Sequence, residues 1–169
     1  MGFEAQMRIR KIFSIAIVYY EKDVDLTALL GRTIEAFVPE DLVDQIYLLN
    51  NYVDETAGRE AYDTQIAPVL TRFSERLQYV AARDLGVAPE KDSYSAQQAL
   101  KLEIARNVET PYYLVLDSKN HFTRLVSWQD FFASDGRAKT HKARHGGYLQ
   151  TCFQHSLAYF GLDLDPEDK

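Results

Sequence analysis

The sequence lacks the features that define several large classes of protein. It has a single cysteine, Cys152, so no disulfide can form within the chain, and we expect a cytoplasmic location. The longest apolar run, from Ile12 to Tyr20, is far shorter than the about 20 residues that span a membrane, so we expect no transmembrane segment. The N-terminal residues also contain no long apolar stretch, and we therefore expect no signal peptide.

Positive charge and common enzyme motifs are scarce as well. The chain has 19 basic and 25 acidic residues and a formal net charge of −6, which argues against nucleic acid as a partner. It contains no G-x-G-x-x-G fingerprint, no Walker A loop and no G-x-S-x-G elbow. These absences argue against a dehydrogenase, a P-loop kinase and an α/β-hydrolase.

Apolar residues make up 46% of the chain, and their order indicates a folded domain in which strands and helices alternate. Short runs rich in β-branched residues predict strands, and apolar residues recurring every three or four positions predict helices. The expected strands are 11–19, 45–50, 77–82 and 112–116, with helices over 25–38, 62–72 and 95–109 between them. A short strand over 122–126, a short helix over 128–132 and a last helix over 148–160 are expected to follow. This order predicts an α/β fold with a mainly parallel sheet flanked by helices.

Ligands of such sheets bind beyond the carboxyl ends of the strands, which directs attention to three loops, 20–23, 50–54 and 117–120. In the third loop, an apolar strand leads directly into Asp117 and then into a polar turn. A rigid sheet would fix this carboxylate where a diphosphate and its cation could lie. Alternatively, Asp117 only caps the turn, and the pattern alone favours neither interpretation.

Residues 1–125 resemble the GT-A glycosyltransferases, and more narrowly a family of uncharacterised glycosyltransferase-like bacterial proteins of the DUF6492 type. The resemblance rests on three segments, KIFSIAIVYY (11–20), SAQQALKLEIA (95–105) and YYLVLDSKNHF (112–122). It implies one domain over 1–169 with a Rossmann-like GT-A fold, made of a nucleotide-sugar-binding core over about 11–126 and a partial helical extension over 127–162.

The resemblance also implies a function. The expected activity is transfer of a sugar from a nucleotide-sugar donor to an unknown acceptor, although no residue stands out as a catalytic base. GT-A enzymes commonly continue for about a hundred residues beyond the acidic strand, so the chain would be a shortened member. The alternative is a non-catalytic nucleotide-binding or protein-interaction module that keeps the GT-A-like fold.

The acidic turn departs from the GT-A pattern in one position. In these enzymes the strand usually ends in Asp-x-Asp, whose carboxylates hold Mg²⁺ or Mn²⁺ against the donor's diphosphate. Asp117 matches the first carboxylate and would be the metal ligand, but Lys119 stands at the second position and offers no oxygen. Asp117 and Asn120 could still hold a metal together with phosphate and water oxygens, or Lys119 could itself neutralise the diphosphate as a fixed cation. We expect donor binding that is independent of metal or depends on it weakly, unless Lys119 is an ordinary solvated side chain.

The other site residues implied by the resemblance lie in two segments. Gln97 and Lys101 are four positions apart, share one side of their helix, and would line the donor pocket. Tyr19, Tyr20 and Asn50 follow strands and would contact the nucleotide base. The alternatives are a solvated helix face for the first pair, core packing for the tyrosines and a turn for Asn50.

One basic cluster remains, over 137–145, with two arginines, two lysines and two histidines. It could hold a phosphate or an anionic acceptor, or it could be a solvated loop.

Overall fold

The computed structural model describes residues 12–88, 94–139 and 148–161. The chain divides into two compact units, Met1–Asp130 and Phe131–Lys169, which are described separately. The expectation of one domain with a helical extension after residue 126 stays a prediction. Within the described ranges, no helix combines the length and apolar character that crossing a bilayer requires.

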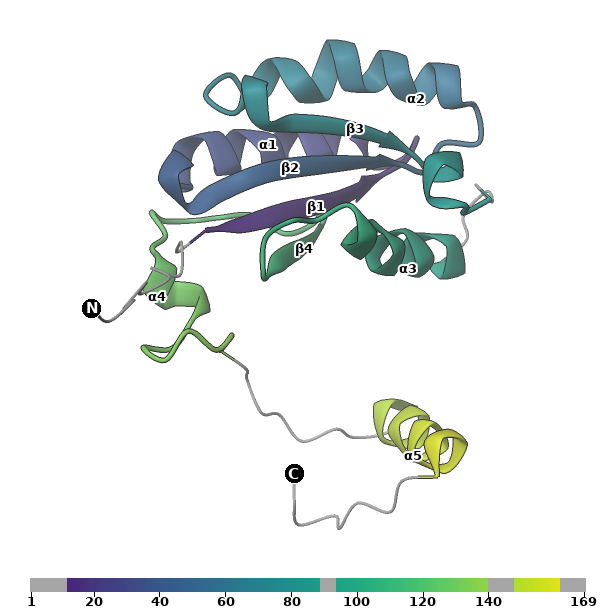
Figure 1. The fold of residues 1–169 in the computed structure, drawn as a ribbon. Coiled ribbons are helices and arrows are strands. Elements are labelled where there is room, and N and C mark those ends of the chain that lie inside the picture. Colours follow the sequence, from purple (N-terminus) through teal and green to yellow (C-terminus); the bar gives the residue numbers. More distant parts are fainter. Residues whose placement is uncertain (1–11, 89–93, 140–147, 162–169) are drawn as a thin grey trace, which may run out of the picture. The chain divides into compact units, whose positions relative to one another are not determined.

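The first unit is built on a sheet of four parallel strands in the order β3-β2-β1-β4. The strands are β1 (Phe13–Tyr19), β2 (Val43–Asn50), β3 (Leu77–Ala81) and β4 (Tyr113–Asp117). Each lies where the apolar runs predicted it, so the predicted α/β fold is confirmed. Figure 1 shows α1 (Val24–Phe37) and α2 (Glu55–Ala61) on one side of the sheet and α3 (Tyr94–Glu103) on the other.

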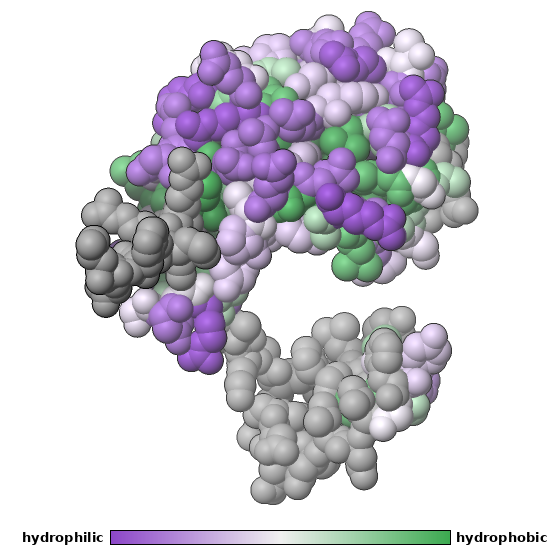
Figure 2. All heavy atoms as spheres, in the orientation of Figure 1, coloured by the Kyte–Doolittle hydropathy of each residue, from purple (hydrophilic) through white to green (hydrophobic). Residues whose placement is uncertain are grey.

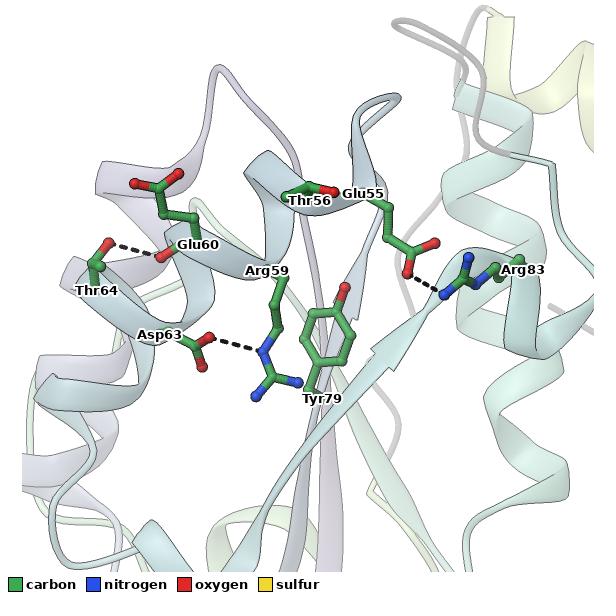
Figure 3. Close-up of a pocket in the computed structure, with 8 residues that line it drawn as sticks. All are labelled: Glu55, Thr56, Arg59, Glu60, Asp63, Thr64, Tyr79 and Arg83. Carbon is green, nitrogen blue, oxygen red and sulfur yellow. Dashed lines mark hydrogen bonds and ion pairs between the residues drawn. The ribbon is translucent and has the colours of Figure 1, made fainter.

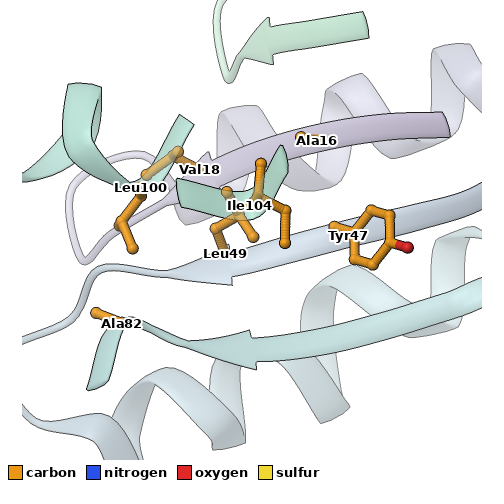
Figure 4. Packing of buried hydrophobic residues seen from close by; sticks show 7 residues of the cluster. All are labelled: Ala16, Val18, Tyr47, Leu49, Ala82, Leu100 and Ile104. Carbon is orange, nitrogen blue, oxygen red and sulfur yellow. The ribbon is translucent and has the colours of Figure 1, made fainter. Parts of the chain in front are cut away.

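β1 is the centre of this arrangement. All seven of its residues are buried, because β2 and β4 pair with its two edges and helices cover its two faces. On the α3 side, Val18 packs with Leu49 of β2 and with Leu100 of α3 and the adjoining Ile104 in one apolar cluster (Figure 4). Hydrophilic residues predominate on the face of this unit drawn in Figure 2, as expected for side chains outside the core.

The helix predicted over 62–72 begins earlier than its apolar periodicity indicated. α2 starts at Glu55, because the Asp54 carboxylate accepts hydrogen bonds from the backbone N–H groups of Thr56 and Ala57 at 3.0 and 3.2 Å. It continues as a π-helical turn, Tyr62–Ile66, and a 3-10 turn, Ala67–Val69. The prediction therefore missed the amino-terminal turns of this helix, whose residues are mostly polar or small.

Two further predictions need correction. α3 ends at Glu103 and is followed by only one 3-10 turn, Ile104–Arg106, so it is shorter than the expected helix over 95–109. No strand forms over 122–126, because the backbone N–H groups at its two ends bond to α1 instead. Phe122 N–H donates to Thr33 Oγ1 at 3.2 Å, and Val126 N–H donates to the Phe37 carbonyl at 3.0 Å.

The remaining elements are short or lie in the second unit. α4 (Trp128–Phe131) agrees with the short helix predicted over 128–132, and α5 (Tyr148–Phe160) with the last predicted helix. The 3-10 turns outside those already named are Glu40–Leu42, Ser74–Arg76 and Ala82–Leu85.

A buried polar network joins α2 to the carboxyl ends of β1 and β2. Tyr19 Oη donates to the Gly58 carbonyl at 2.9 Å, and Asn50 Nδ2 donates to Tyr79 Oη at 2.9 Å. The Asn50 side chain lies directly against Gly58, where a Cβ atom would be 2.3 Å from Asn50 Oδ1. Only a glycine therefore allows α2 to pack this closely on the sheet.

We predict that Gly58→Ala lowers the free energy of unfolding by about 2 kcal/mol, because the added methyl group overpacks the helix–sheet contact. In an ordinary helix the same change would stabilise the protein by about 1 kcal/mol, so the sign of the effect is diagnostic. Urea denaturation measures it, with Glu60→Ala on the exposed side of α2 as the control. Unchanged or increased stability of the Gly58→Ala protein would contradict the packing described above.

Candidate functional site

The order of the strands singles out one place on the sheet. From β1 the chain moves through β2 to β3 on one side, and then returns to place β4 on the other side of β1. Parallel sheets bind ligands where the strand order reverses in this way, beyond the carboxyl ends of the two diverging strands. The register pairs Val18 with Asp117 and Tyr19 with Asn50, so the three loops predicted to meet do lie at one edge.

Asp117 ends β4 at this edge and forms an ion pair with Lys101 of α3. Lys101 Nζ lies 2.5 Å from Asp117 Oδ1, a contact that joins two candidates singled out separately in the sequence. The Asp117 side chain is 59% exposed, whereas that of Lys101 is only 13% exposed. The pair therefore presents an accessible carboxylate held by a largely buried ammonium group.

The position of Lys101 is fixed at its backbone. Tyr113, at the start of β4, donates a hydrogen bond from its hydroxyl to the Lys101 carbonyl at 3.0 Å. The Lys101 side chain then extends toward Asp117 at the other end of the same strand. α3 runs antiparallel to the strands, so its N-terminal end lies at the carboxyl edge of the sheet. Gln97 therefore lies one turn nearer this edge than Lys101, on the same helix face.

The turn after Asp117 is held by its own polar groups. Asn120 Oδ1 accepts a hydrogen bond from Asp117 N–H at 2.8 Å, and Asn120 N–H donates to the Asp117 carbonyl at 2.8 Å. Ser118 is buried and donates from Oγ to Asp23 Oδ2 at 2.8 Å, which ties the β4 turn to the loop after β1. Lys119 is exposed between these two anchors, while the Asn120 side-chain oxygen already has its partner.

Two residues proposed for the nucleotide base lie in the interior instead. Tyr19 is 0% exposed and Asn50 is 1% exposed, and both belong to the network with Gly58 described above. Burial raises the pKa of the Tyr19 hydroxyl well above its ordinary value. Their side chains thus support the tips of β1 and β2, and Tyr20, half-buried at the end of β1, is the tyrosine nearest the surface here.

Asn51 is a further polar residue at this edge. Its backbone N–H donates to the Tyr19 carbonyl at 3.0 Å, which extends the pairing of β1 with β2 beyond Asn50. The side chain is 4% exposed, and its Oδ1 atom has no hydrogen-bond partner among the residues that the structure describes. A buried acceptor without a donor is rare and marks this position as a candidate for ligand or water binding.

We predict that Tyr19 makes the protein less stable in alkali. Below pH 10.0, the ordinary pKa of tyrosine, the hydroxyl is protonated in both the folded and the unfolded chain, and its contribution to stability is complete. As the pH rises from there toward the raised folded pKa, only the unfolded chain loses the proton, and stability falls by up to about 1.4 kcal/mol per pH unit.

Urea denaturation between pH 9 and 11 tests this, with Tyr19→Phe as the comparison. Other buried tyrosines contribute equally to the pH dependence of the unfolding free energy in both proteins. Because only the Tyr19→Phe protein lacks the Tyr19 hydroxyl, its unfolding free energy should fall less steeply with pH. Parallel slopes in the two proteins would show that the Tyr19 hydroxyl ionises freely in the folded state.

The structure also reveals a groove that the sequence did not indicate (Figure 3). It has a volume of about 680 Å³ and lies between α2 and β3. The Arg59 guanidinium lies 4.7 Å from the centre of the Tyr79 ring, and its Nε donates to Asp63 at 2.9 Å. Arg83 pairs with Glu55 at 2.7 Å. The groove was missed because half of it consists of the helical turns that periodicity did not predict, and both of its cations are paired within it.

The predicted basic cluster over 137–145 lies mainly outside the described residues. Of its members, Arg137 and Lys139 are described, and Arg137 forms an ion pair with Asp135 at 2.8 Å. Within the ranges that the structure covers, no three histidine, cysteine, aspartate or glutamate side chains form a group that could hold a metal ion.

Comparison with known proteins identifies a family without a known activity. A model described as "Family of unknown function (DUF6492)" matches residues 6–155. No curated protein matches the chain significantly.

Proposed function

The chain belongs to the DUF6492 family of unknown function, and we propose that it binds a nucleotide-sugar donor at the carboxyl edge of β1 and β4. In this proposal the protein is glycosyltransferase-like and transfers the sugar to an acceptor. The support comes from the molecule's own geometry and from the three segments that resemble GT-A enzymes.

One observation carries the proposal: the Asp117–Lys101 pair lies where the strand order reverses. A diphosphate needs positive charge and N–H or O–H donors at a fixed position. Lys101 supplies an ammonium group held by a carboxylate and by its own backbone anchor, and Lys119 supplies a second one at the exposed tip of the turn. The two ammonium groups come from α3 and from the turn after β4, and side-chain contacts hold both elements to the sheet. The fold therefore fixes the elements that carry the positive charges which a diphosphate needs.

The rest of the donor would extend from the diphosphate along the edge toward β2. In the proposal Tyr20 would stack on the base, Asn51 would offer the oxygen that has no partner among the described residues to a base or ribose donor, and Gln97 would approach from α3. Tyr19 and Asn50 act from beneath, by holding the ends of β1 and β2 against α2.

Sugar transfer requires stabilisation of the departing diphosphate, which ammonium groups provide, and usually a base that activates the acceptor hydroxyl. Asp117 is an exposed carboxylate of the site, but it is engaged by Lys101. This engagement favours one second candidate function, a module that binds the donor without turning it over.

We predict that nucleotide-sugars raise the midpoint of thermal unfolding, whereas free nucleosides and free sugars at the same concentration do not. A ligand at a hundred times its Kd stabilises the folded chain by about 2.7 kcal/mol. Gln97→Ala should reduce the shift, and Glu60→Ala on the exposed side of α2 should leave it unchanged. If no nucleotide or nucleotide-sugar shifts the midpoint, the proposal fails.

Product analysis then separates the two functions. Release of nucleoside diphosphate from a binding donor, with transfer or hydrolysis of the sugar, identifies an enzyme. Binding without any release over long incubation identifies the module.

A further inference from the structure

We propose that Lys101 takes the place of a divalent cation in this site, so that the protein binds the diphosphate of its donor without a metal. This inference rests on the proposed donor site and identifies the group that neutralises the ligand there. It replaces the alternative in which Lys119 alone does so.

The oxygens of the site do not fit a metal ion. Mg²⁺ needs oxygen ligands in octahedral array at about 2.1 Å, and Asp117 Oδ1 already has the Lys101 ammonium at 2.5 Å. A divalent cation on the same carboxylate would be strongly repelled by this buried positive charge. The Asn120 amide oxygen, the other oxygen expected to help, accepts from the Asp117 backbone instead.

The carboxylates of the loop after β1 are not free ligands for a metal ion either. Asp23 Oδ2 accepts the hydrogen bond from buried Ser118, and the Glu21 carboxylate accepts from the Val53 backbone at 3.2 Å. Lys119 stands at the position of the second carboxylate in the GT-A pattern. Each of these three carboxylates therefore already has one oxygen engaged within the fold, and Lys119 brings a cation where the GT-A pattern has a carboxylate.

The same geometry suits an anion. An ammonium group has three N–H donors, of which one is directed at Asp117, so that two remain for phosphate oxygens. Its side chain is largely buried, where charge-assisted hydrogen bonds are less weakened by water. Of the three charged side chains that α3 and the β4 turn contribute to the proposed site, Lys101 and Lys119 are cations and Asp117 is an anion, so these three side chains supply more positive than negative charge.

Asp117 then has a different role from the one in the Asp-x-Asp pattern. It is a positioning residue that holds the Lys101 ammonium at the strand end, and it does not itself contact the phosphates. Removal of the Asp117 carboxylate should therefore change the affinity for the diphosphate little. Lys101 would lose the group that positions it, but the anion would also lose a nearby negative charge that repels it.

The test is calorimetric titration of the full chain with uridine diphosphate, guanosine diphosphate and inorganic pyrophosphate, first in EDTA and then in Mn²⁺. We expect at least one of these probes to bind in EDTA, with an affinity that Mn²⁺ changes by less than about threefold, under 1 kcal/mol. Mn²⁺ titrated alone into the protein should give no heat of binding that depends on Asp117.

Two variants of the ion pair should behave differently. Lys101→Met keeps the length of the buried stem and should weaken binding by about tenfold to a hundredfold, because a charge-assisted hydrogen bond is lost. Asp117→Asn keeps an acceptor for the ammonium and should stay within about threefold of the original affinity. Metal-mediated binding predicts the opposite for Asp117→Asn, a large loss. Circular dichroism and the unfolding midpoint establish that both variants are folded, and Lys101→Arg, which keeps the charge, should bind better than Lys101→Met.

The outcomes separate this inference from the function on which it rests. Binding that appears only with Mn²⁺, or that survives Lys101→Met but not Asp117→Asn, overturns the role of Lys101 and leaves the donor site intact. If no probe binds in either buffer and no nucleotide-sugar shifts the midpoint, both proposals are overturned.

Discussion

The structure depends on the complete burial of β1. This strand has no exposed residue, and its backbone is hydrogen-bonded to a parallel neighbour on each edge. An apolar strand in this position forces the chain to place β2 and β4 on opposite sides and to end all three strands at one edge of the sheet. Polar side chains that follow them, from Tyr20 to Asp23 and from Asp117 to Asn120, therefore meet without any need for a long functional loop.

The same burial explains why the sheet could be predicted from the sequence. A run such as 13–19 has no polar side that could face water, so its apolar residues are explained only by a strand covered on both faces. α2 had no comparable signal. Its first turns contain Gly58 and several polar residues, and they are helical because Asp54 caps them and because Gly58 packs against Asn50. Helix formation there depends on tertiary contacts, which periodicity does not report.

The candidate site was predictable in part, for a related reason. Strand ends can be located in a sequence, so the loops at the carboxyl edge could be identified together with Asp117, whereas Gln97 and Lys101 were implied by the resemblance to GT-A enzymes. The partners of each side chain could not, because they are set by the register and the helix packing. Lys101 meets Asp117 across sixteen residues, and Ser118 meets Asp23 across ninety-five. Tyr19 and Tyr20 are adjacent and chemically identical, yet Tyr19 is the last residue of the buried strand β1 and Tyr20 lies just beyond it and is half-buried, so residue type alone could not tell them apart.

The Asp117–Lys101 pair also stabilises the Lys101 ammonium group in the protein without ligand. A lysine side chain that is only 13% exposed would lose hydration without compensation if it had no counterion, and Asp117 supplies one within the fold. A ligand phosphate arriving at the edge can accept the remaining ammonium protons while the bond to Asp117 persists. The cation therefore stays in place before and after binding, and no ordering of a free side chain has to accompany the arrival of the ligand. The proposed site would obtain its positive charge from the folding of α3 onto β4, so its formation would depend on the stability of that contact rather than on the supply of metal.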